Sequence, residues 1–311
     1  MAVGDIIVGI DIGTSKICTV VGEVNKFNQI EIVSCQGTEC AGIKKGKIID
    51  SDGIVQAIRK TIVETEKNSD IKINSAYVNI SGKYITIVQN NITRETKDKY
   101  SGISLKDVQV AIMQIKDIEI PDDKVIIDLI PEEFVLDNGR EVADPVGQLS
   151  SNFTLKAQVV LANKEYIKQV TNIIRKVGIE LDGIVPAIVA ERSFIFETNE
   201  LNDKVMLLDI GAGNTDIGIF DKSSLVYTNT IDLGGDNITS DISIVLGISL
   251  EEAEKLKKQY GLALKSFIDN DNNIMLSTCN LGNKTIKSSE LIEIIEARVE
   301  EIFSLVGKDI R

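Results

Sequence analysis

The sequence predicts an α/β protein with two lobes built from a duplicated motif. An apolar segment ending in Asp-Ile-Gly occurs twice, at Asp11 and again at Asp209. In both places a polar or glycine-rich turn follows and opens a second apolar segment, which is typical of an antiparallel hairpin. Elsewhere strands alternate with amphipathic helical segments. Two copies of one motif so far apart favour a duplicated fold whose turns face each other.

Composition and charge exclude several classes of function. The chain has 311 residues, a length that suffices for two domains of ordinary size. Hydrophobic residues make up 43% and charged residues 26%, as in ordinary globular proteins. A formal charge of −13 argues against nucleic-acid binding. The absence of histidine excludes Ser-His-Asp and Cys-His catalysis and histidine-ligated metals. No signal peptide or membrane-spanning segment is expected, and four cysteines without CxxC spacing indicate reduced thiols in the cytoplasm.

The first lobe is expected to comprise residues 1–82 and 164–197. Its predicted strands are apolar segments between turns: 6–12, 17–24, 30–36, 72–80 and 179–185. A helix with Ser51 as its expected N-cap presents Ile54 and Ile58 on one face. A second amphipathic helix ends before Gly178, and residues 187–197 are predicted to form a third.

Residues 83–163 are predicted to form a small α+β subdomain inserted into the first lobe. The predicted strands are 84–88, 125–130, 133–136 and 154–162, with a turn at 137–139. Ser104 and Asp107 resemble a capping box that opens a helix to about residue 116.

The second lobe is expected in residues 198–311. Its predicted strands are 205–208, 217–220 and 225–232. Helices are predicted from about residue 238, from a capping box at Ser249 to about residue 260, and after an N-cap at Ser288 or Ser289.

The second turn has the composition of an anion site. Gly211 and Gly213 permit left-handed backbone angles and the close approach of a bulky ligand. Successive N–H groups in such a turn form a concave site for a phosphate. Asn214 and Thr215 add side-chain donors. A plain hairpin with a glycine-rich turn is the alternative, and the repeat of the motif favours the phosphate site.

Charged residues lie beside both turns. In the first, Lys16 is expected to reach a phosphate as a point charge, the alternative being a solvated lysine at a hairpin tip. Asp11 and Asp209 end the strands that lead into the turns, where they are expected to hold Mg²⁺ through its waters. The alternative is an Asx-turn at each aspartate.

Two further signals are weaker. Gly234 and Gly235 lie between a strand and a helix, where a phosphate can approach closely. Glu254 and Lys257 face the same side of a helix, and a surface ion pair is the alternative. The Walker A pattern is absent, and no GxGxxG follows the first strand. No residue stands out as a general base, so any hydrolysis of a bound polyphosphate is expected to be slow.

The order of these motifs resembles the actin/chaperone-ATPase/sugar-kinase superfamily, and within it the bacterial cell-division protein FtsA family. The segments that carry the resemblance are VGIDIGTSKICTVVGE, AGIKKGKIIDSDGIVQAI, YVNISGKYI and EEAEKLKKQYG, and it covers essentially the whole chain. Ala212 and Asn214 stand where the family often has Gly and Thr. The resemblance implies an actin-like two-lobed fold with duplicated ribonuclease-H-like domains and an inserted subdomain.

The resemblance also implies ATP and Mg²⁺ in a cleft between the lobes. The residues it assigns to the nucleotide are Gly13, Thr14, Ser15, Lys16, Gly211, Gly213, Asn214, Thr215, Gly234, Gly235, Glu254 and Lys257, with Asp11 and Asp209 facing the metal.

For partners, the resemblance implies filament formation, binding to the tubulin-like protein FtsZ, and contacts of the inserted subdomain with other division proteins. It places the family at the inner face of the membrane at the division site, tethered by a C-terminal amphipathic helix. The family continues beyond the position of Arg311 with an adenine-contacting loop and that tail. We therefore expect weakened nucleotide binding and no autonomous membrane attachment for residues 1–311. Two alternatives stay open: a small-molecule kinase of the superfamily and a pilus-assembly actin relative.

Overall fold

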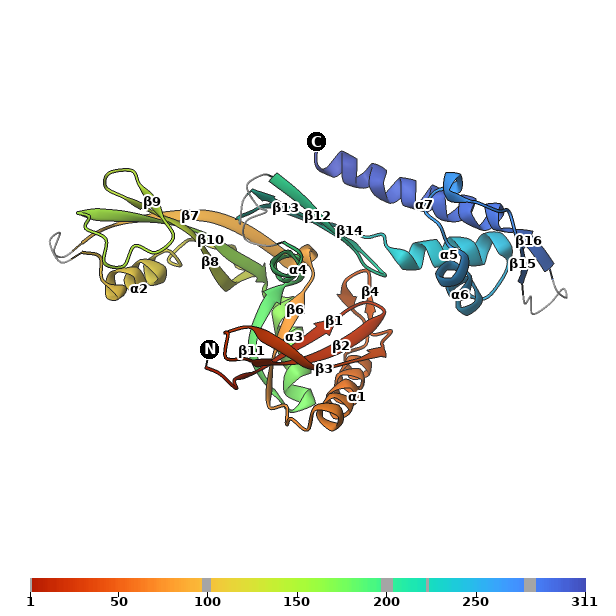
Figure 1. The fold of residues 1–311 in the computed structure, drawn as a ribbon, viewed down its shortest axis with the longest axis horizontal. Coiled ribbons are helices and arrows are strands. Elements are labelled where there is room, and N and C mark those ends of the chain that lie inside the picture. Colours follow the sequence, from red (N-terminus) through yellow and green to blue (C-terminus); the bar gives the residue numbers. More distant parts are fainter. Residues whose placement is uncertain (1, 97–101, 197–203, 222–223, 277–283) are drawn as a thin grey trace.

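The computed structural model describes residues 2–96, 102–196, 204–221, 224–276 and 284–311. Figure 1 shows a five-stranded sheet with its helices as the lower body of the molecule. Above it lies a row of three parts, with the inserted subdomain on the left, a three-stranded sheet in the middle and a group of helices on the right. The boundaries predicted for the lobes and the insertion stay predictions, and the one at 197–198 lies outside the described residues.

The lower sheet has the order β11–β6–β1–β2–β3. These strands are β1 (Ile6–Ile12), β2 (Lys16–Val24), β3 (Ile30–Glu39), β6 (Ser75–Ile80) and β11 (Glu180–Pro186). The first three are antiparallel neighbours, whereas β6 runs parallel to β1 and to β11. Parallel pairing of distant segments requires long crossovers, and these are made here by helices and by the insertion.

Helices α1 (Ser51–Ser69) and α3 (Lys164–Val177) bury their apolar faces against this sheet. Ile54 and Ile58 of α1 are fully buried, as the helical period of the sequence predicts. The predicted N-cap at Ser51 is wrong by one residue. Asp50 caps the helix because its carboxylate accepts a hydrogen bond from the Gly53 amide at 3.0 Å.

The inserted subdomain is a four-stranded sheet in the order β7–β10–β8–β9 with helix α2 (Leu105–Gln114). Its strands are β7 (Ile85–Glu95), β8 (Lys124–Leu136), β9 (Glu141–Val142) and β10 (Asn152–Asn163). The predicted break between two strands at Pro131 is wrong. The chain continues as the single strand β8, with an irregular register next to this proline opposite Lys156 and Ala157. A bulge accommodates proline, which has no N–H for the ladder.

The second half of the chain begins with the antiparallel sheet β12 (Lys204–Ile210), β13 (Thr215–Asp221) and β14 (Ser224–Ile231), preceded by helix α4 (Ala187–Ile195). Helices α5 (Gly235–Leu246), α6 (Leu250–Tyr260) and α7 (Ser288–Asp309) pack around a separate apolar cluster together with strands β15 (Asn273–Leu276) and β16 (Lys284–Lys287).

Two helix starts differ from the sequence prediction. Helix α5 begins at Gly235, before residue 238, because the Gly235 and Asp236 amides donate to the carbonyls of Gly211 and Ala212 at 2.9 and 2.8 Å. The N-cap of α7 is Lys287, because the Ser288 hydroxyl instead bonds Asp271 at 3.1 Å.

The two hairpins β1–β2 and β12–β13 share one geometry. Ile12 pairs with Ile17 in the first, and Ile210 pairs with Thr215 in the second, so the turns 13–16 and 211–214 have equal length. Each turn is closed by a glycine amide, Gly13 to the Lys16 carbonyl at 3.0 Å and Gly211 to the Asn214 carbonyl at 2.9 Å. The duplication predicted from the sequence is therefore present in the backbone. Within the described ranges, no helix combines the length and the apolar character needed to cross a membrane.

Candidate functional site

The turns 13–16 and 211–214 face each other across the boundary between the two halves of the molecule. A methyl group on Gly213 would lie 2.8 Å from Thr14 Cγ2, so the turns come close to contact. A cavity of about 590 Å³ lies beside them. Among the residues that line it are those predicted for the site: Asp11, Gly13, Thr14, Ser15, Lys16, Asp209, Gly211 and Asn214.

The left-handed backbone angles predicted for Gly211 and Gly213 are absent, so what favours glycine in the turns is limited space. A Cβ atom on Gly13 would lie 2.9 Å from the Lys16 carbonyl oxygen, and one on Gly211 would lie 3.2 Å from that of Asn214. A larger residue at position 13 would displace the Lys16 carbonyl that closes the first turn, whereas one at position 211 requires only a small shift of the Asn214 carbonyl.

Asn79 on β6 fixes the first turn from the neighbouring strand. Its amide nitrogen donates to Asp11 Oδ1 at 2.6 Å, and its amide oxygen accepts from the Ile12 N–H at 2.9 Å. Sequence reasoning assigned Asn79 no role, although it lies in the segment YVNISGKYI that carries the family resemblance. Only the parallel pairing of β1 with β6 brings it to the site.

Carboxylates gather at the cavity and repel one another. Burial raises the pKa of Asp11, opposed by the bond from Asn79 and the charge of Lys16. Burial and the charge of Asp216 raise the pKa of Asp209. Burial, the charge of Asp209 and a hydrogen bond with it raise the pKa of Glu191, on α4, to about 7. Glu191 was missed because helix α4 carries no motif.

This donor set fits a hydrated divalent cation. A cation would favour the ionised forms of Asp11 and Asp209, whose negative charges disfavour each other in the protein alone. Among the described residues no group of three or more Asp, Glu, Cys or His side chains is arranged to hold a metal directly. Mg²⁺ commonly keeps several of its waters and uses one or two carboxylates, which this arrangement offers.

Asp216, on β13 next to the second turn, connects the two halves. It is 2% exposed, and its carboxylate accepts from Ser81 Oγ at 3.0 Å, from the Gly82 N–H at 3.3 Å and from the Thr230 hydroxyl. Ser81 and Gly82 lead from β6 into the short 3₁₀ helix η1 (Gly82–Tyr84) and the insertion. The Asn214 amide also donates to Ser81 Oγ, at 3.2 Å, so the second turn itself bonds to the first half.

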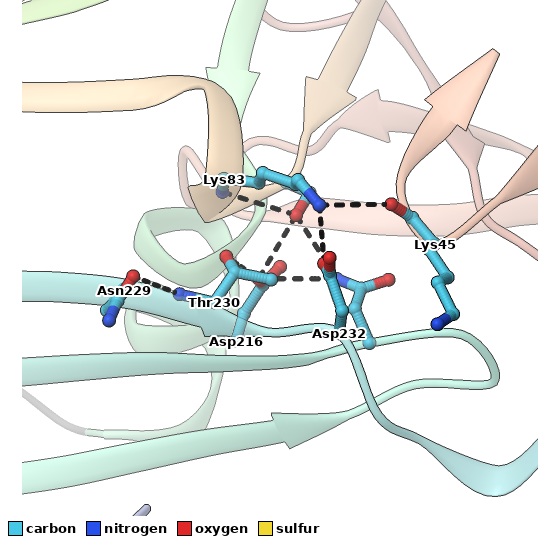
Figure 2. Close-up of polar contacts among 8 residues, drawn as sticks. Lys45, Lys83, Asp216, Asn229, Thr230 and Asp232 are labelled. Atoms are coloured by element: carbon cyan, nitrogen blue, oxygen red, sulfur yellow. Dashed lines mark hydrogen bonds and ion pairs between the residues drawn. The ribbon is translucent and has the colours of Figure 1, made fainter. Parts of the chain in front are cut away.

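A second contact between the halves lies next to this one (Figure 2). The Lys83 ammonium pairs with Asp232 at 2.5 Å and donates to the backbone carbonyl of Lys45 at 3.4 Å. One lysine therefore joins η1, the segment around Lys45 and the end of β14.

Of the remaining predicted residues, Gly213 lines a smaller neighbouring cavity, whereas Thr215, Gly234, Gly235, Glu254 and Lys257 line neither cavity. Thr215 is buried, and its hydroxyl donates to the Leu233 carbonyl at 2.9 Å. Gly234 packs against the carbonyls of Gly211 and Ala212, so a Cβ there would lie 2.5 Å from the first of them. These contacts support the second turn from behind.

Glu254 and Lys257 form one polar group with the start of α5. The Lys257 ammonium bonds Glu254 at 2.6 Å, Thr239 Oγ1 at 2.7 Å and the Gly235 carbonyl at 3.0 Å. Burial opposes ionisation of Glu254, but the bonds from Lys257 and Thr239 outweigh it and hold its pKa below the usual range. Binding of a ligand by the predicted residues stays a prediction.

Two lobes with duplicated hairpins, turns that face each other beside one cavity, and a group of helices after the second sheet define an actin-like fold. Comparison with solved structures agrees. The chain matches the PilM–PilN type IV pilus biogenesis complex at 17% identity and a TM-score of 0.56, covering 82% of this chain and 69% of that one. It matches MreB5 of Spiroplasma citri bound to ADP at 14% identity and a TM-score of 0.53, covering 98% and 78%. The α/β actin-like fold predicted from the sequence is thus confirmed.

The sequence comparisons identify the family within this class. The family model for cell division protein FtsA matches residues 206–305, and the model for the SHS2 domain inserted in FtsA matches residues 82–161. Cell division protein FtsA of Bacillus subtilis is 32% identical over 308 residues, which cover 99% of this chain and 70% of that protein. The chain belongs to the FtsA family of cell division proteins.

Proposed function

We propose that the chain binds ATP with Mg²⁺ between the two turns and acts as a scaffold in bacterial cell division. The observation that supports this most directly is a pair of hairpin turns, equal in length and closure, that face each other beside one cavity. Membership of the FtsA family supports the division role. The MreB5 protein, similar in fold, has been solved with ADP and with AMPPNP, which supports a nucleotide as the ligand.

In the proposed complex the phosphates bind between the turns. The residues assigned to them are Gly13, Thr14, Ser15 and Lys16 on one side and Gly211, Gly213, Asn214 and Thr215 on the other. Gly234 and Gly235 approach the phosphates and ribose, and Glu254 and Lys257 approach the nucleoside. Asp11 and Asp209 face Mg²⁺ through its waters, and the metal offsets the charge of the phosphates. Asn79 keeps Asp11 oriented for that role.

Calorimetric titration with ATP tests this assignment. We expect heat of binding that requires Mg²⁺ and disappears in EDTA. The double substitution Asp11→Asn, Asp209→Asn should remove the metal requirement together with most of the affinity. Asp221→Asn, at the far end of β13, is the matched control and should bind as the wild type does. Binding of equal strength with and without Mg²⁺ would contradict the metal assignment, and no binding at all would contradict the nucleotide.

For the finer role, we propose that the protein forms filaments and links the FtsZ ring to the membrane. The inserted subdomain would contact other division proteins, and attachment to the membrane would depend on a C-terminal tail. These proposals rest on family membership. Sedimentation with and without ATP tests polymerisation, and pelleting with liposomes tests membrane binding.

A pull-down separates this proposal from the pilus-assembly alternative. The likeness to the PilM–PilN complex is one of fold. We expect retention on the C-terminal peptide of FtsZ and none on a short N-terminal peptide of a pilus membrane partner. The reverse pattern would favour the pilus role. Phosphoryl transfer to a sugar or carboxylate would favour the kinase alternative.

A further inference from the structure

A short basic hairpin lies beside the two turns and has no part in the assignment above. Strands β4 (Ile43–Lys44) and β5 (Lys47–Ile48) pair with each other and enclose Lys45 and Gly46. Three of the six residues 43–48 are lysines in a chain whose formal charge is −13. The strands predicted from the sequence do not include these segments, so the hairpin is a finding of the structure.

The hairpin forms one wall of a second cavity, of about 450 Å³, whose other wall is made by the tips of both turns. Thr14 and Ser15 come from the first turn and Gly213 from the second. Lys44 and Lys45 line the same cavity, whereas Lys47 is absent from its lining. Asp236 and Asn237, at the start of α5, complete this wall. Two lysines therefore line the space next to the turns proposed to hold phosphate.

The backbone of the hairpin is strained at Lys45. Lys45 has a φ of 50° and Gly46 a φ of 71°, so both central residues of the turn are left-handed. Such two-residue turns favour Asn-Gly, because asparagine and glycine tolerate the left-handed region better than lysine does. A lysine in this position costs conformational energy, and strain of this kind concentrates at functional sites.

The hairpin is also fixed to the second half of the molecule. Lys83, which pairs with Asp232, donates to the Lys45 carbonyl at 3.4 Å. A Cβ atom on Gly213 would lie 3.4 Å from the Lys45 backbone nitrogen, so the hairpin touches the second turn. Figure 2 shows that Lys45 meets Lys83 through its backbone oxygen while its side chain extends away from Lys83.

From these observations we infer that the β4–β5 hairpin is a third phosphate-binding element, in which Lys44 and Lys45 bind the polyphosphate chain of a nucleoside triphosphate. The inference rests on the nucleotide binding proposed above and adds a site to it. A lysine ammonium binds phosphate as a compact point charge, and such charge-assisted bonds are stronger than neutral ones. Because the hairpin belongs to the first lobe and touches the second turn, the polyphosphate would be held on three sides.

Titration of a double variant that removes both lysine charges tests the inference. In Lys44→Gln, Lys45→Gln we expect the affinity for Mg·ATP and for inorganic tripolyphosphate to fall about ten-fold or more, which corresponds to one or two charge-assisted bonds. The affinity for adenosine should not change. Lys47→Gln is the matched control on the same hairpin, and it should bind as the wild type does. Lys44→Arg, Lys45→Arg keeps the charge and should retain most of the affinity.

Three outcomes would overturn the inference alone: wild-type affinity in the Gln double variant, an equal loss in Lys47→Gln, or an equal loss in the Arg variant. In each of these the wild type still binds nucleotide, so the proposed function would stand. If the wild type binds neither Mg·ATP nor tripolyphosphate, both proposals fail. Circular dichroism and a thermal melt of every variant show whether a loss of binding reflects unfolding.

Discussion

Glycines at the turns set how closely the two halves approach each other. Gly213 meets Thr14 across the boundary, and no side chain fits between them without displacement, since the added carbon would lie 2.8 Å from Thr14 Cγ2. A contact this short forces the neighbour to move. Because the neighbour belongs to the other lobe, the movement separates the turns rather than unfolding either hairpin.

The substitution Gly213→Ala should therefore weaken Mg·ATP binding by about ten-fold, with a loss of stability under ~1 kcal/mol, because the clash is between lobes. Calorimetry measures the binding and urea unfolding the stability. Combining it with Thr14→Ser, which removes Cγ2, should restore most of the affinity. Gly307→Ala on α7, where a Cβ meets nothing within 4 Å, is the control. If the double variant binds Mg·ATP no better than Gly213→Ala alone, the loss is not caused by a clash with Thr14 Cγ2.

Glu191 makes the stability of the ligand-free protein depend on pH. Its pKa is raised from 4.5 to about 7 by burial and by the charge of Asp209. The folded state thus binds the proton more tightly than the unfolded state. The contribution of this carboxyl to the free energy of unfolding is present below pH 4.5 and is lost as the pH rises through about 7.

Urea unfolding at several pH values between 5 and 8 measures this effect. Without Mg²⁺, the wild type should lose stability across that range, and Glu191→Gln should lose less because it has no proton to release. Glu180→Gln, on the exposed start of β11, is a control that should follow the wild type. Parallel curves for wild type and Glu191→Gln would show that Glu191 is not the titrating group.

At the scale of elements, the sequence predicts what local patterns determine. Both hairpins, the capping box at Ser104 and the end of α3 at Gly178 are where the sequence predicts them. In these places apolar alternation, a capping side chain or a glycine acts within a few residues. Asp209 and Gly211 could be found as a candidate site because the motif recurs in the chain.

What the sequence could not predict depends on distant segments. Helix α5 starts at Gly235 because its first amides bond carbonyls of the second turn, a contact that no local pattern encodes. Asn79 reaches Asp11 only through the parallel pairing of β6 with β1. Pro131 suggested a break between strands because its missing N–H is a local signal, whereas the long partner β10 keeps β8 continuous.

One buried side chain connects the insertion to the second sheet. Gln158 on β10 is fully buried; its amide nitrogen donates to the Leu225 carbonyl at 2.8 Å, and its amide oxygen accepts from the Leu225 N–H at 3.2 Å. It thereby satisfies both backbone groups of one residue of β14. The Gln158 side chain thus links β10 of one sheet to β14 of another, in place of backbone hydrogen bonds between the two strands.

Gln158→Leu should cost about 2 kcal/mol or more, because it leaves two buried backbone groups of Leu225 without their partner. Chemical denaturation measures the loss. Gln89, directly opposite on β7 and exposed, is the matched control, and Gln89→Leu should change stability by less than ~0.5 kcal/mol. Equal effects of the two substitutions would contradict the role of Gln158.

At the scale of the whole molecule, Asp216 is the central contact between the lobes. Four donors converge on its carboxylate, from Ser81 after β6, Gly82 of η1, Thr230 of β14 and Asn214 of the second turn, and it is almost fully buried. Figure 2 shows Asp216 and Thr230 close to the pair formed by Lys83 and Asp232. The lobes are therefore held together by polar groups immediately beside the proposed phosphate site.

Asp216→Ala should destabilise the protein by about 2–3 kcal/mol, because Ser81, Gly82 and Thr230 would lose their acceptor. The matched control is Asp221→Ala at the other end of the same strand, where a surface pair with Lys204 at 3.6 Å contributes less than ~1 kcal/mol. Differential scanning calorimetry compares them. An unfolding temperature that falls equally in both variants would show that Asp216 contributes no more to stability than Asp221.

The position of Ser81 and Gly82 in the chain has a mechanical consequence. The same two residues donate hydrogen bonds to the carboxylate of Asp216 and begin the connection into the insertion. If the three-stranded sheet and the helices after it rotate relative to the five-stranded sheet, the hinge coincides with the start of β7. The distal end of the insertion lies far from the start of β7 in Figure 1. A small rotation at the nucleotide would therefore produce a large displacement of that end. Neighbouring molecules in contact with the inserted subdomain would thus respond to ligand binding in the cavity through the changed orientation of that subdomain.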